Sequence, residues 1–175
     1  MTDQNSGVSG TAFDERAYRD ALGVFATGVA IVTTRCPTRG AIGVTINSLT
    51  SVSLRPPLVS WSLHERSSSR AVFDTATHFA IHILCVDQLA ICRRFAQATA
   101  HDRFEGLQVS PGLGGVPILD CYSALLECKR VHAFQGGDHI VYFGEVACFR
   151  QTDREALAFH RGSFGRFEPL SSRIA

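Results

Sequence analysis

Two long segments of β-strand character, residues 122–134 and 139–150, are separated by only four residues, Gln135 to Asp138. The two glycines and the aspartate between them are typical of a tight β-hairpin. A turn this short permits only antiparallel pairing, because parallel strands need a much longer connection. The sequence therefore predicts a long antiparallel hairpin, and the fold must include an antiparallel sheet.

Other segments also have strand character, at residues 29–35, 41–48, 58–64, 78–86 and 157–164. The first two flank a turn at residues 37–40 and predict a second hairpin. The third alternates with the period of two that is typical of a strand. Pro56 and Pro57 mark its start, since proline is tolerated at the first position of a strand. Residues 49–57 are assigned to a loop.

Three helices are expected, at residues 13–28, 65–76 and 87–98. Thr11 followed by Asp14 resembles a capping box at the start of the first helix, and Gly28 is expected to close it. A serine is expected to cap the second helix, and Asp87 to open the third. Residues 99–119 then form a long loop rich in glycine and proline, which in a compact domain is usually functional or part of an interface.

About six or seven strands and three short helices follow one another without regular alternation. This order favours a mainly β fold, an antiparallel barrel with appended helices, over a doubly wound parallel sheet. One domain is expected at residues 13–168, between a disordered N-terminal tail at residues 1–12 and a C-terminal tail at residues 169–175.

Composition excludes several classes of protein. The net charge is +1, which provides no strongly basic face for nucleic acid. No apolar run reaches the length of a membrane span, and the polar first residues lack the apolar core of a secretion signal. The expected location is therefore the cytoplasm, without a nucleic acid or membrane partner.

No metal site is expected. The six cysteines, at positions 36, 85, 92, 121, 128 and 148, form no C-x-x-C pair. In a reducing compartment such cysteines behave as small buried apolar residues, so neither a disulfide framework nor a tetrahedral zinc site is predicted. His78 and His82 have the i, i+4 spacing of a helical metal pair, but they lie in a segment with strand character.

The usual nucleotide-binding motifs are absent. The glycine cluster at residues 112–117 lacks the spacing and the following helix of a dinucleotide fingerprint, and there is no P-loop. A different polar cluster occupies residues 44–53, where six of ten residues are Thr, Ser or Asn. These side chains suit a planar heterocycle that carries a polyol chain. They also suit a turn whose side chains bond their own backbone, and chemistry alone favours this second interpretation.

Three smaller patterns are also candidates. Residues 66–70, Arg-Ser-Ser-Ser-Arg, suit either a phosphate at a helix start or a serine cap with solvated arginines. His139, after a turn at Gly137-Asp138, would donate to a ligand at the rim of the barrel, although a solvated or core-satisfied histidine is the more common finding. Residues 161–164 form a turn that alone indicates only a strand end.

Taken in order, several segments resemble one family. They are ALGVFATGVAIVTT, GVTINSLTSVSLRPPLVSWSL, a serine-rich turn, FAIHILCVDQLAICRRFA, DRFEGL, GGDHIVYFGEV and FHRGSF. Together they are similar to the flavin reductase-like proteins, the short-chain NAD(P)H:flavin oxidoreductases, over residues 13–167. The resemblance implies an FMN-binding split β-barrel, antiparallel and Greek-key-like, that forms a homodimer.

The resemblance also implies positions for the ligands. It places Thr27, Val29 and Ala30 near the flavin, Thr45, Ile46, Asn47 and Ser48 along its ring and ribityl chain, and Ser51 and Ser53 beside them. Ser62, Ser67, Ser68, Ser69 and Arg70 correspond to the phosphate region. Arg161, Gly162, Ser163 and Phe164 correspond to a nicotinamide-side element. His139 matches a histidine near the nicotinamide and is the candidate catalytic residue.

The implied activity is hydride transfer from NADH or NADPH to FMN or FAD, with reduced flavin supplied to a partner monooxygenase. In such an enzyme the cofactors carry the chemistry, and the protein orients them. Three alternatives remain: a flavin- or haem-binding module without reductase activity, an enzyme of the same fold, flavin-dependent or non-redox, that acts on an organic substrate, and a purely structural dimerisation domain.

Overall fold

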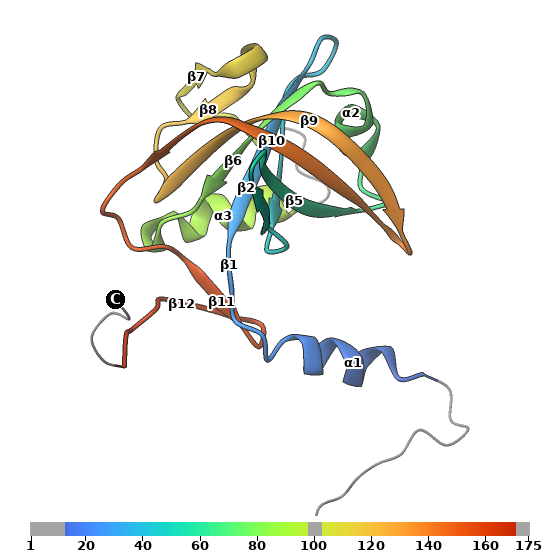
Figure 1. The fold of residues 1–175 in the computed structure, drawn as a ribbon. Coiled ribbons are helices and arrows are strands. Elements are labelled where there is room, and N and C mark those ends of the chain that lie inside the picture. Colours follow the sequence, from blue (N-terminus) through green and yellow to red (C-terminus); the bar gives the residue numbers. More distant parts are fainter. Residues whose placement is uncertain (1–12, 98–102, 171–175) are drawn as a thin grey trace, which may run out of the picture.

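The computed structural model describes residues 13–97 and 103–170. Its largest unit is a sheet of seven strands in the order β3-β2-β6-β9-β10-β5-β4, and every neighbouring pair in it is antiparallel (Figure 1). The strands are β2 (Ala30–Cys36), β3 (Gly40–Ile46), β4 (Thr50–Leu54), β5 (Pro57–His64), β6 (His78–Ile83), β9 (Ala124–Gly136) and β10 (His139–Gln151). The predicted mainly β, antiparallel class with few helices is confirmed.

The long hairpin is formed by β9 and β10, as the turn residues predicted. The first strand extends two residues further into the turn than expected, to Gly136, so only Gly137 and Asp138 connect it to β10. Gly137 has a positive φ of 66°, a conformation that glycine adopts without a steric penalty. The register pairs β10 with β5 on its other side and places His139 opposite His64.

The two ends of the sheet approach each other through one serine. Ser48, just after β3, accepts a hydrogen bond from the N–H of Ser62 on β5 at 3.0 Å and donates one to its carbonyl at 3.3 Å. The sheet is therefore curled rather than flat (Figure 1). The loop predicted at residues 49–57 is wrong in part, because residues 50–54 form β4, an edge strand paired with β5. Its exposed side chains hid the alternating pattern of a half-buried strand.

Aromatic side chains fill the main core inside this curl. Trp61 stacks on Tyr142 with ring centroids 4.8 Å apart and contacts Phe73 edge-on at 4.9 Å. Such pairs add about 0.5–1.5 kcal/mol each to the free energy gained by burial. Phe73 belongs to the short helix α2 (Arg70–Thr75), whose Asp74 accepts a hydrogen bond from the Tyr142 hydroxyl. The alternation predicted for residues 58–64 is confirmed by the burial of Val59, Trp61 and Leu63.

Helix α3 (Leu89–Ala96) covers a second apolar cluster. A short 3-10 turn, η1 (Val86–Gln88), precedes it and is capped by Cys85, so Asp87 lies within the turn and does not open the helix as predicted. Phe95 of α3 packs so closely on β3 that a Cβ atom on Gly43 would lie 2.5 Å from its ring. A side chain at position 43 would therefore displace the helix or the strand.

The segment at residues 103–119 is more ordered than the predicted loop. It contains β7 (Val109–Pro111), the turn η2 (Leu113–Gly115) and β8 (Pro117–Leu119), and β7 pairs with β8. The buried carboxylate of Glu127 fixes this unit by accepting hydrogen bonds from the Leu113 N–H and the Arg150 guanidinium, both at 2.6 Å. Burial alone would raise the pKa of Glu127, but these two hydrogen bonds, one from Cys148 and the charge of Arg150 together offset it, so the pKa is lowered.

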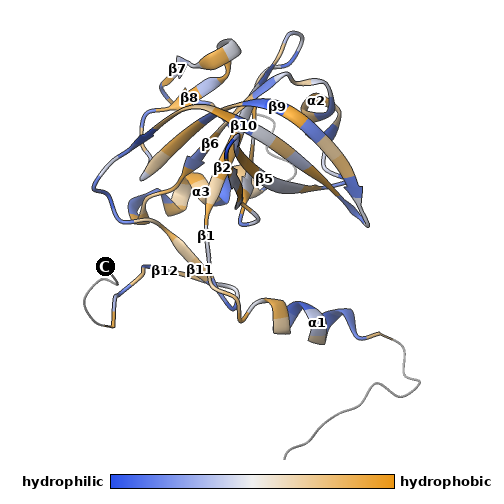
Figure 2. Ribbon diagram, in the orientation of Figure 1, coloured by the Kyte–Doolittle hydropathy of each residue, from blue (hydrophilic) through white to orange (hydrophobic). Residues whose placement is uncertain are grey.

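A smaller sheet forms an arm that projects from the body. The arm comprises α1 (Glu15–Leu22), β1 (Thr27–Gly28), β11 (Ala158–His160) and β12 (Ser163–Gly165), with strand order β1-β11-β12 (Figure 1). No residue of α1 is buried, and Figure 2 shows apolar residues along the arm. Among the described residues, no helix is long and apolar enough to span a membrane.

Several boundaries in the arm differ from those predicted. Asp14 alone caps α1, accepting hydrogen bonds from the Arg16 and Ala17 N–H groups, and the helix ends at Gly23 rather than Gly28. The single strand predicted at residues 157–164 is two strands joined by a turn, because Arg161 and Gly162 both have positive φ. Thr11, the tail at residues 1–12, positions 98–102 of the predicted helix and loop, and residues 171–175 lie outside the described residues.

Candidate functional site

A cavity of about 500 Å³ opens where the ends of β3 and β5 meet. The Ser48–Ser62 hydrogen bonds lie in its wall, so the curl of the sheet creates it. The lining residues are Val44, Thr45, Ile46, Asn47, Ser48, Ser62, Leu63, His64, Arg66, Ser67, Ser68, Ala96, Arg103 and His139. Eight of the residues predicted from the sequence thus come together in one cavity: Thr45, Ile46, Asn47, Ser48, Ser62, Ser67, Ser68 and His139.

The hydroxyl groups on this wall already have partners within the protein. Thr45 donates to the carbonyl of Cys92 on α3 at 2.7 Å, and Ser48 is bonded to the backbone of Ser62. The interpretation that these side chains bond the backbone of their own turn is therefore wrong for both, because their partners are backbone groups distant in sequence. Asn47 differs, because its side chain is exposed in the cavity. It supplies both a donor and an acceptor for a ligand.

The serine-rich turn divides into two parts. Ser67, Ser68 and Arg66 line the cavity, so two hydroxyls and a cation face it together. Ser69 is buried at the start of α2, and Arg70 is paired with Asp74 at 3.2 Å; neither lines the cavity. A phosphate in this cavity would thus meet the first half of the turn.

His139 lies in the cavity wall within a small charged cluster. Its Nδ1 is 2.7 Å from the Asp138 carboxylate, and this hydrogen bond lowers the pKa of Asp138. The His64 ring lies 5.1 Å from the His139 ring, and its Nε2 is 3.8 Å from the same carboxylate. Sequence reasoning missed His64. The signal was its position at the end of β5, which the β5–β10 pairing places opposite His139.

Arg103 is a second residue that the sequence did not single out. Its guanidinium donates to the carbonyls of Gly43, at 2.6 Å, and of Gln97. It lines the cavity, and burial lowers its pKa. Its Nε atom is buried and has no hydrogen-bond partner among the described residues. A donor in this state suits a ligand with acceptor oxygens.

A second cavity, of about 520 Å³, adjoins the first. The two share Thr45, Ile46, Asn47 and Ala96. The second is more apolar, and the remaining lining residues are Val29, Cys92, Arg93, Gln97, Phe159 and Phe164. Residues 45–47 therefore form a common wall with His139 on one side and Phe164 on the other.

Comparison with known proteins agrees with this geometry. The family model described as "Flavin reductase like domain" matches residues 22–168. The chain belongs to the flavin reductase-like family. It is 44% identical over 155 residues to the FMN reductase (NADH) SmoA of Agrobacterium fabrum, a match that covers 88% of this chain and 87% of that protein.

Two further matches extend the family assignment. The flavin-dependent monooxygenase reductase subunit HsaB of Rhodococcus jostii is 33% identical over 94% of this chain and 84% of its own length. The Streptomyces globisporus NADH:FAD oxidoreductase SgcE6, solved with NAD and FAD fragments, superimposes with a TM-score of 0.84 at 32% identity, covering 93% of this chain and all of that one. The family resemblance found in the sequence is confirmed.

The remaining predicted residues of this flavin reductase-like chain lie outside the two cavities. Ala30 lines a small pocket of about 110 Å³ beside Val29. Ser51 and Ser53 lie on β4, and Ser163 is exposed on β12. Arg161 and Gly162 line a third cavity, next to α1. Thr27 on β1 has a buried hydroxyl without a hydrogen-bond partner among the described residues. The roles of these residues remain predictions.

The residues of the first cavity fit a flavin nucleotide. The Asn47 carboxamide suits the donors and acceptors of the ring, and the unpartnered Nε of Arg103 suits a carbonyl or phosphate oxygen. Arg66 beside the hydroxyls of Ser67 and Ser68 suits a phosphate group. The apolar second cavity suits a flat aromatic ring placed against the shared wall.

Proposed function

We propose that this protein transfers hydride from NADH or NADPH to FMN or FAD and supplies the reduced flavin to a partner monooxygenase. One observation carries the proposal: two cavities of about 500 and 520 Å³ share the wall at residues 45–47. Because residues 45–47 line both cavities, we place the flavin ring against them with one face open, so that a nicotinamide ring stacks directly on it between His139 of the first cavity and Phe164 of the second. The relatives named as an NADH-dependent FMN reductase and a monooxygenase reductase subunit support the same activity.

In this proposal Asn47 and the backbone of residues 45–48 hold the flavin ring, and Arg66, Ser67 and Ser68 hold its phosphate. Val29 and Phe164 pack against the nicotinamide side. When bound, the two cofactors supply the hydride chemistry themselves. The protein contributes orientation, apolar walls that exclude water, and the positive charge of Arg66 and Arg103. The proposal also includes contacts from predicted residues that do not line the first or second cavity: Thr27, Ala30, Ser51, Ser53, Ser69, Arg70, Arg161, Gly162 and Ser163.

His139 is the residue proposed to orient the nicotinamide. The hydrogen bond to Asp138 fixes the ring, because a carboxylate acceptor holds the Nδ1 proton in place. The His64 ring, on the neighbouring strand β5, contacts the His139 ring and restricts its rotation. His139 therefore presents its Nε2 atom in a restricted direction at the cavity wall.

The activity is tested by anaerobic mixing. Purified protein is combined with FMN or FAD and with NADH or NADPH, and the visible absorbance of the oxidised flavin is followed. Loss of that absorbance with stoichiometric oxidation of the nicotinamide is expected. Flavin binding without any nicotinamide oxidation would instead indicate a binding module.

Replacing His139 with alanine is expected to lower kcat by about 10- to 100-fold, because misorientation of a reactant costs rate on this scale. The dissociation constant for flavin should change far less, because Asn47 and the phosphate contacts remain. Single-turnover kinetics and flavin titration measure the two effects separately. His132→Ala removes an exposed imidazole elsewhere on β9 and is the matched control. Equal kinetics in His139→Ala and the parent would remove His139 from the mechanism.

The finer architecture is also a proposal. We infer that the curled sheet is the FMN-binding split β-barrel of the family, Greek-key-like in its connections, and that two copies form a homodimer in the cytoplasm. The arm supports the dimer, since its apolar side chains lack cover from the described chain. Phe25 is 77% exposed and Leu22 57%. Exposed apolar surface of this kind marks an interface.

The double substitution Leu22→Glu and Phe25→Glu is therefore expected to convert a dimer into a monomer, because a buried unpaired carboxylate is costly. Sedimentation velocity measures the change in mass. Phe149→Glu alters a phenylalanine of similar exposure, 71%, on β10 outside the arm, and should leave the mass unchanged. A parent protein that is already monomeric at micromolar concentration would contradict the inference.

A second candidate function is favoured by the apolar character of the second cavity. An enzyme of the same fold could use bound flavin on an organic substrate held there, between Val29, Cys92 and Phe164. The anaerobic experiment separates the two. This candidate requires flavin to copurify and not to be exchanged, whereas the proposed reductase turns over many equivalents of added flavin.

A further inference from the structure

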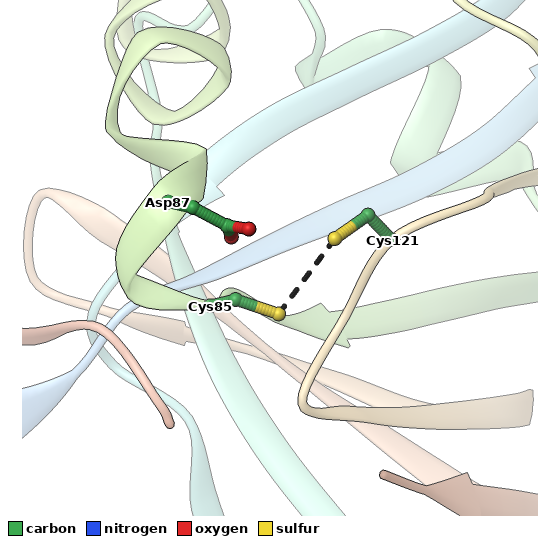
Figure 3. A group of neighbouring side chains, drawn as sticks. All are labelled: Cys85, Asp87 and Cys121. Atoms are coloured by element: carbon green, nitrogen blue, oxygen red, sulfur yellow. Dashed lines mark hydrogen bonds between the residues drawn. The ribbon is translucent and has the colours of Figure 1, made fainter. Parts of the chain in front are cut away.

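Two cysteines far apart in sequence meet at the start of η1. Cys85 caps the turn, and Cys121 lies between β8 and β9; their Sγ atoms are 3.8 Å apart (Figure 3). The carboxylate of Asp87 lies beside them, and ligand atoms of all three residues fall within 4.8 Å of one another. Among the described residues, this is the one group of three potential metal ligands found so close together. Sequence spacing alone did not reveal it, because 36 residues separate the cysteines.

The distances match those of a tetrahedral thiolate site. Zinc binds sulfur at about 2.3 Å, so two thiolates on one tetrahedron lie about 3.8 Å apart. The Sγ atoms of Cys85 and Cys121 already have this separation. Asp87 is exposed, so the third ligand lies on the solvent side, where a cation can enter and water can complete the coordination.

One buried side chain holds both cysteines in position. The carboxamide of Gln88 accepts from the N–H of Cys85 and donates to the carbonyl of Cys121, both at 2.9 Å. Gln88 is 4% exposed. Gln88 therefore fixes the backbone of both cysteines on the buried side of the site. In metal sites, residues that do not bind the metal often orient the ligands in this way.

A positive group already occupies the open side. Nη1 of Arg154 lies 3.2 Å from the Cys121 Sγ and 3.2 Å from the Asp87 carboxylate. The guanidinium thus makes contacts that a cation between these atoms would make. The Arg154 side chain is 55% exposed, so it is free to move into solvent when a cation with higher charge arrives.

We propose that Cys85, Cys121 and Asp87 bind a thiophilic divalent cation of the zinc type, in place of the Arg154 guanidinium. Binding deprotonates the two thiols and releases their protons to solvent. The cation then ties the start of the η1–α3 segment to the connection between β8 and β9. The cavities contact α3 at Cys92, Arg93 and Ala96 and are not lined by Cys85, Asp87 or Cys121, so the proposed site is separate from them.

The test uses the full-length protein, reduced with a phosphine, freed of metal by a chelator and then titrated with Co²⁺ and Zn²⁺. One equivalent of Co²⁺ is expected to bind with a thiolate-to-cobalt charge-transfer band, and Zn²⁺ should abolish that band by displacement. Cys121→Ser is expected to weaken binding by more than about 100-fold, since even partners outside the ligand set contribute 10- to 100-fold.

Arg154→Ala provides the sharpest prediction, because it removes the competing guanidinium. Its affinity for Zn²⁺, measured by competition with a chromophoric chelator, should rise about tenfold, as expected when a contact worth about 1.4 kcal/mol no longer has to be displaced. Cys148→Ser removes an exposed cysteine on β10 and should bind as the parent does. Retained flavin binding shows that each variant is folded.

Three results would overturn the proposal. The reduced parent protein could show no charge-transfer band, or Cys121→Ser could bind Co²⁺ as tightly as the parent, or Arg154→Ala could leave the affinity unchanged. A mass lower by two hydrogens before reduction, together with no metal binding afterwards, would assign the pair to a disulfide instead.

Discussion

Alanine in place of Arg103 is expected to weaken flavin binding by about 10- to 100-fold. The guanidinium holds the carbonyls of Gly43 and Gln97, and so joins β3 to the end of α3 at the cavity wall. Hydrogen bonds that involve a charged group contribute about 1.5–3 kcal/mol each, and the substitution removes both of them and the free Nε donor. Titration of flavin fluorescence against protein concentration measures the loss.

The neighbouring Arg94 provides a matched control for this prediction. It donates to the carbonyl of Glu105 at 2.8 Å, so it holds the same segment of chain from the outside without lining either cavity. Arg94→Ala should loosen this segment and leave the flavin dissociation constant within about threefold of the parent value. Arg103→Lys should restore part of the lost affinity, because it retains the charge. If both alanine variants weaken binding equally, Arg103 acts only by holding the chain.

The free energy of unfolding should begin to decrease as soon as the pH falls below 6.5, because of one buried histidine. Nδ1 of His82 lies 3.2 Å from the Ile31 carbonyl, and its Nε2 accepts the Leu119 N–H at 3.1 Å, so the folded state requires the neutral ring. Burial lowers the pKa of His82 from 6.5 to about 4. In the unfolded chain the same ring takes up a proton as the pH falls below 6.5, and the folded state does not.

The stabilisation is therefore complete above pH 6.5 and is lost progressively down to about pH 4. The free energy of unfolding should fall by about 2 kcal/mol between pH 7 and pH 5, since each unit of pKa difference corresponds to about 1.4 kcal/mol. Glu127 has a lowered pKa as well, but its contribution disappears only below its ordinary value of 4.5. Urea unfolding at a series of pH values measures the slope.

The His82→Gln variant separates this effect from general acid unfolding. It should be less stable than the parent at pH 7, because glutamine cannot reach both Ile31 and Leu119 in the same way. Its stability should nevertheless vary little between pH 6.5 and pH 5. His132→Gln, at an exposed position, should keep the slope of the parent. A slope that survives in His82→Gln would assign the acid sensitivity to other groups.

Local sequence signals predicted most of the strands. The Gly137-Asp138 turn and the alternation through Trp61 indicated antiparallel strands, and both depend only on near neighbours in the chain. The edge strand β4 and the pair β7–β8 were missed. Their residues lack an alternating pattern of burial, because β4 and β7 are mostly exposed and β8 is wholly buried.

The site was predicted in part for a similar reason. Thr45 to Ser48 and the serine-rich turn were recognisable as polar runs, and the first run lines the same cavity as the first half of the turn. His64, Arg103 and the Cys85–Cys121 pair were not recognisable. His64 reaches the cavity through the register of β5 and β10, and the other residues come together because separate segments of the chain meet in the fold. Neither effect can be recognised from spacing along the sequence.

The position of the arm has a practical consequence for handling the molecule. Helix α1 and strand β12, the first and last elements of the described chain, leave the body at one pole (Figure 1). A reporter or solid support joined next to α1 or β12 would therefore lie on the arm, beside the second cavity, whose wall includes Phe159 of β11 and Phe164 of β12. The same pole carries the apolar side chains of α1, so a bulky group attached there would also obstruct the proposed contact between two copies.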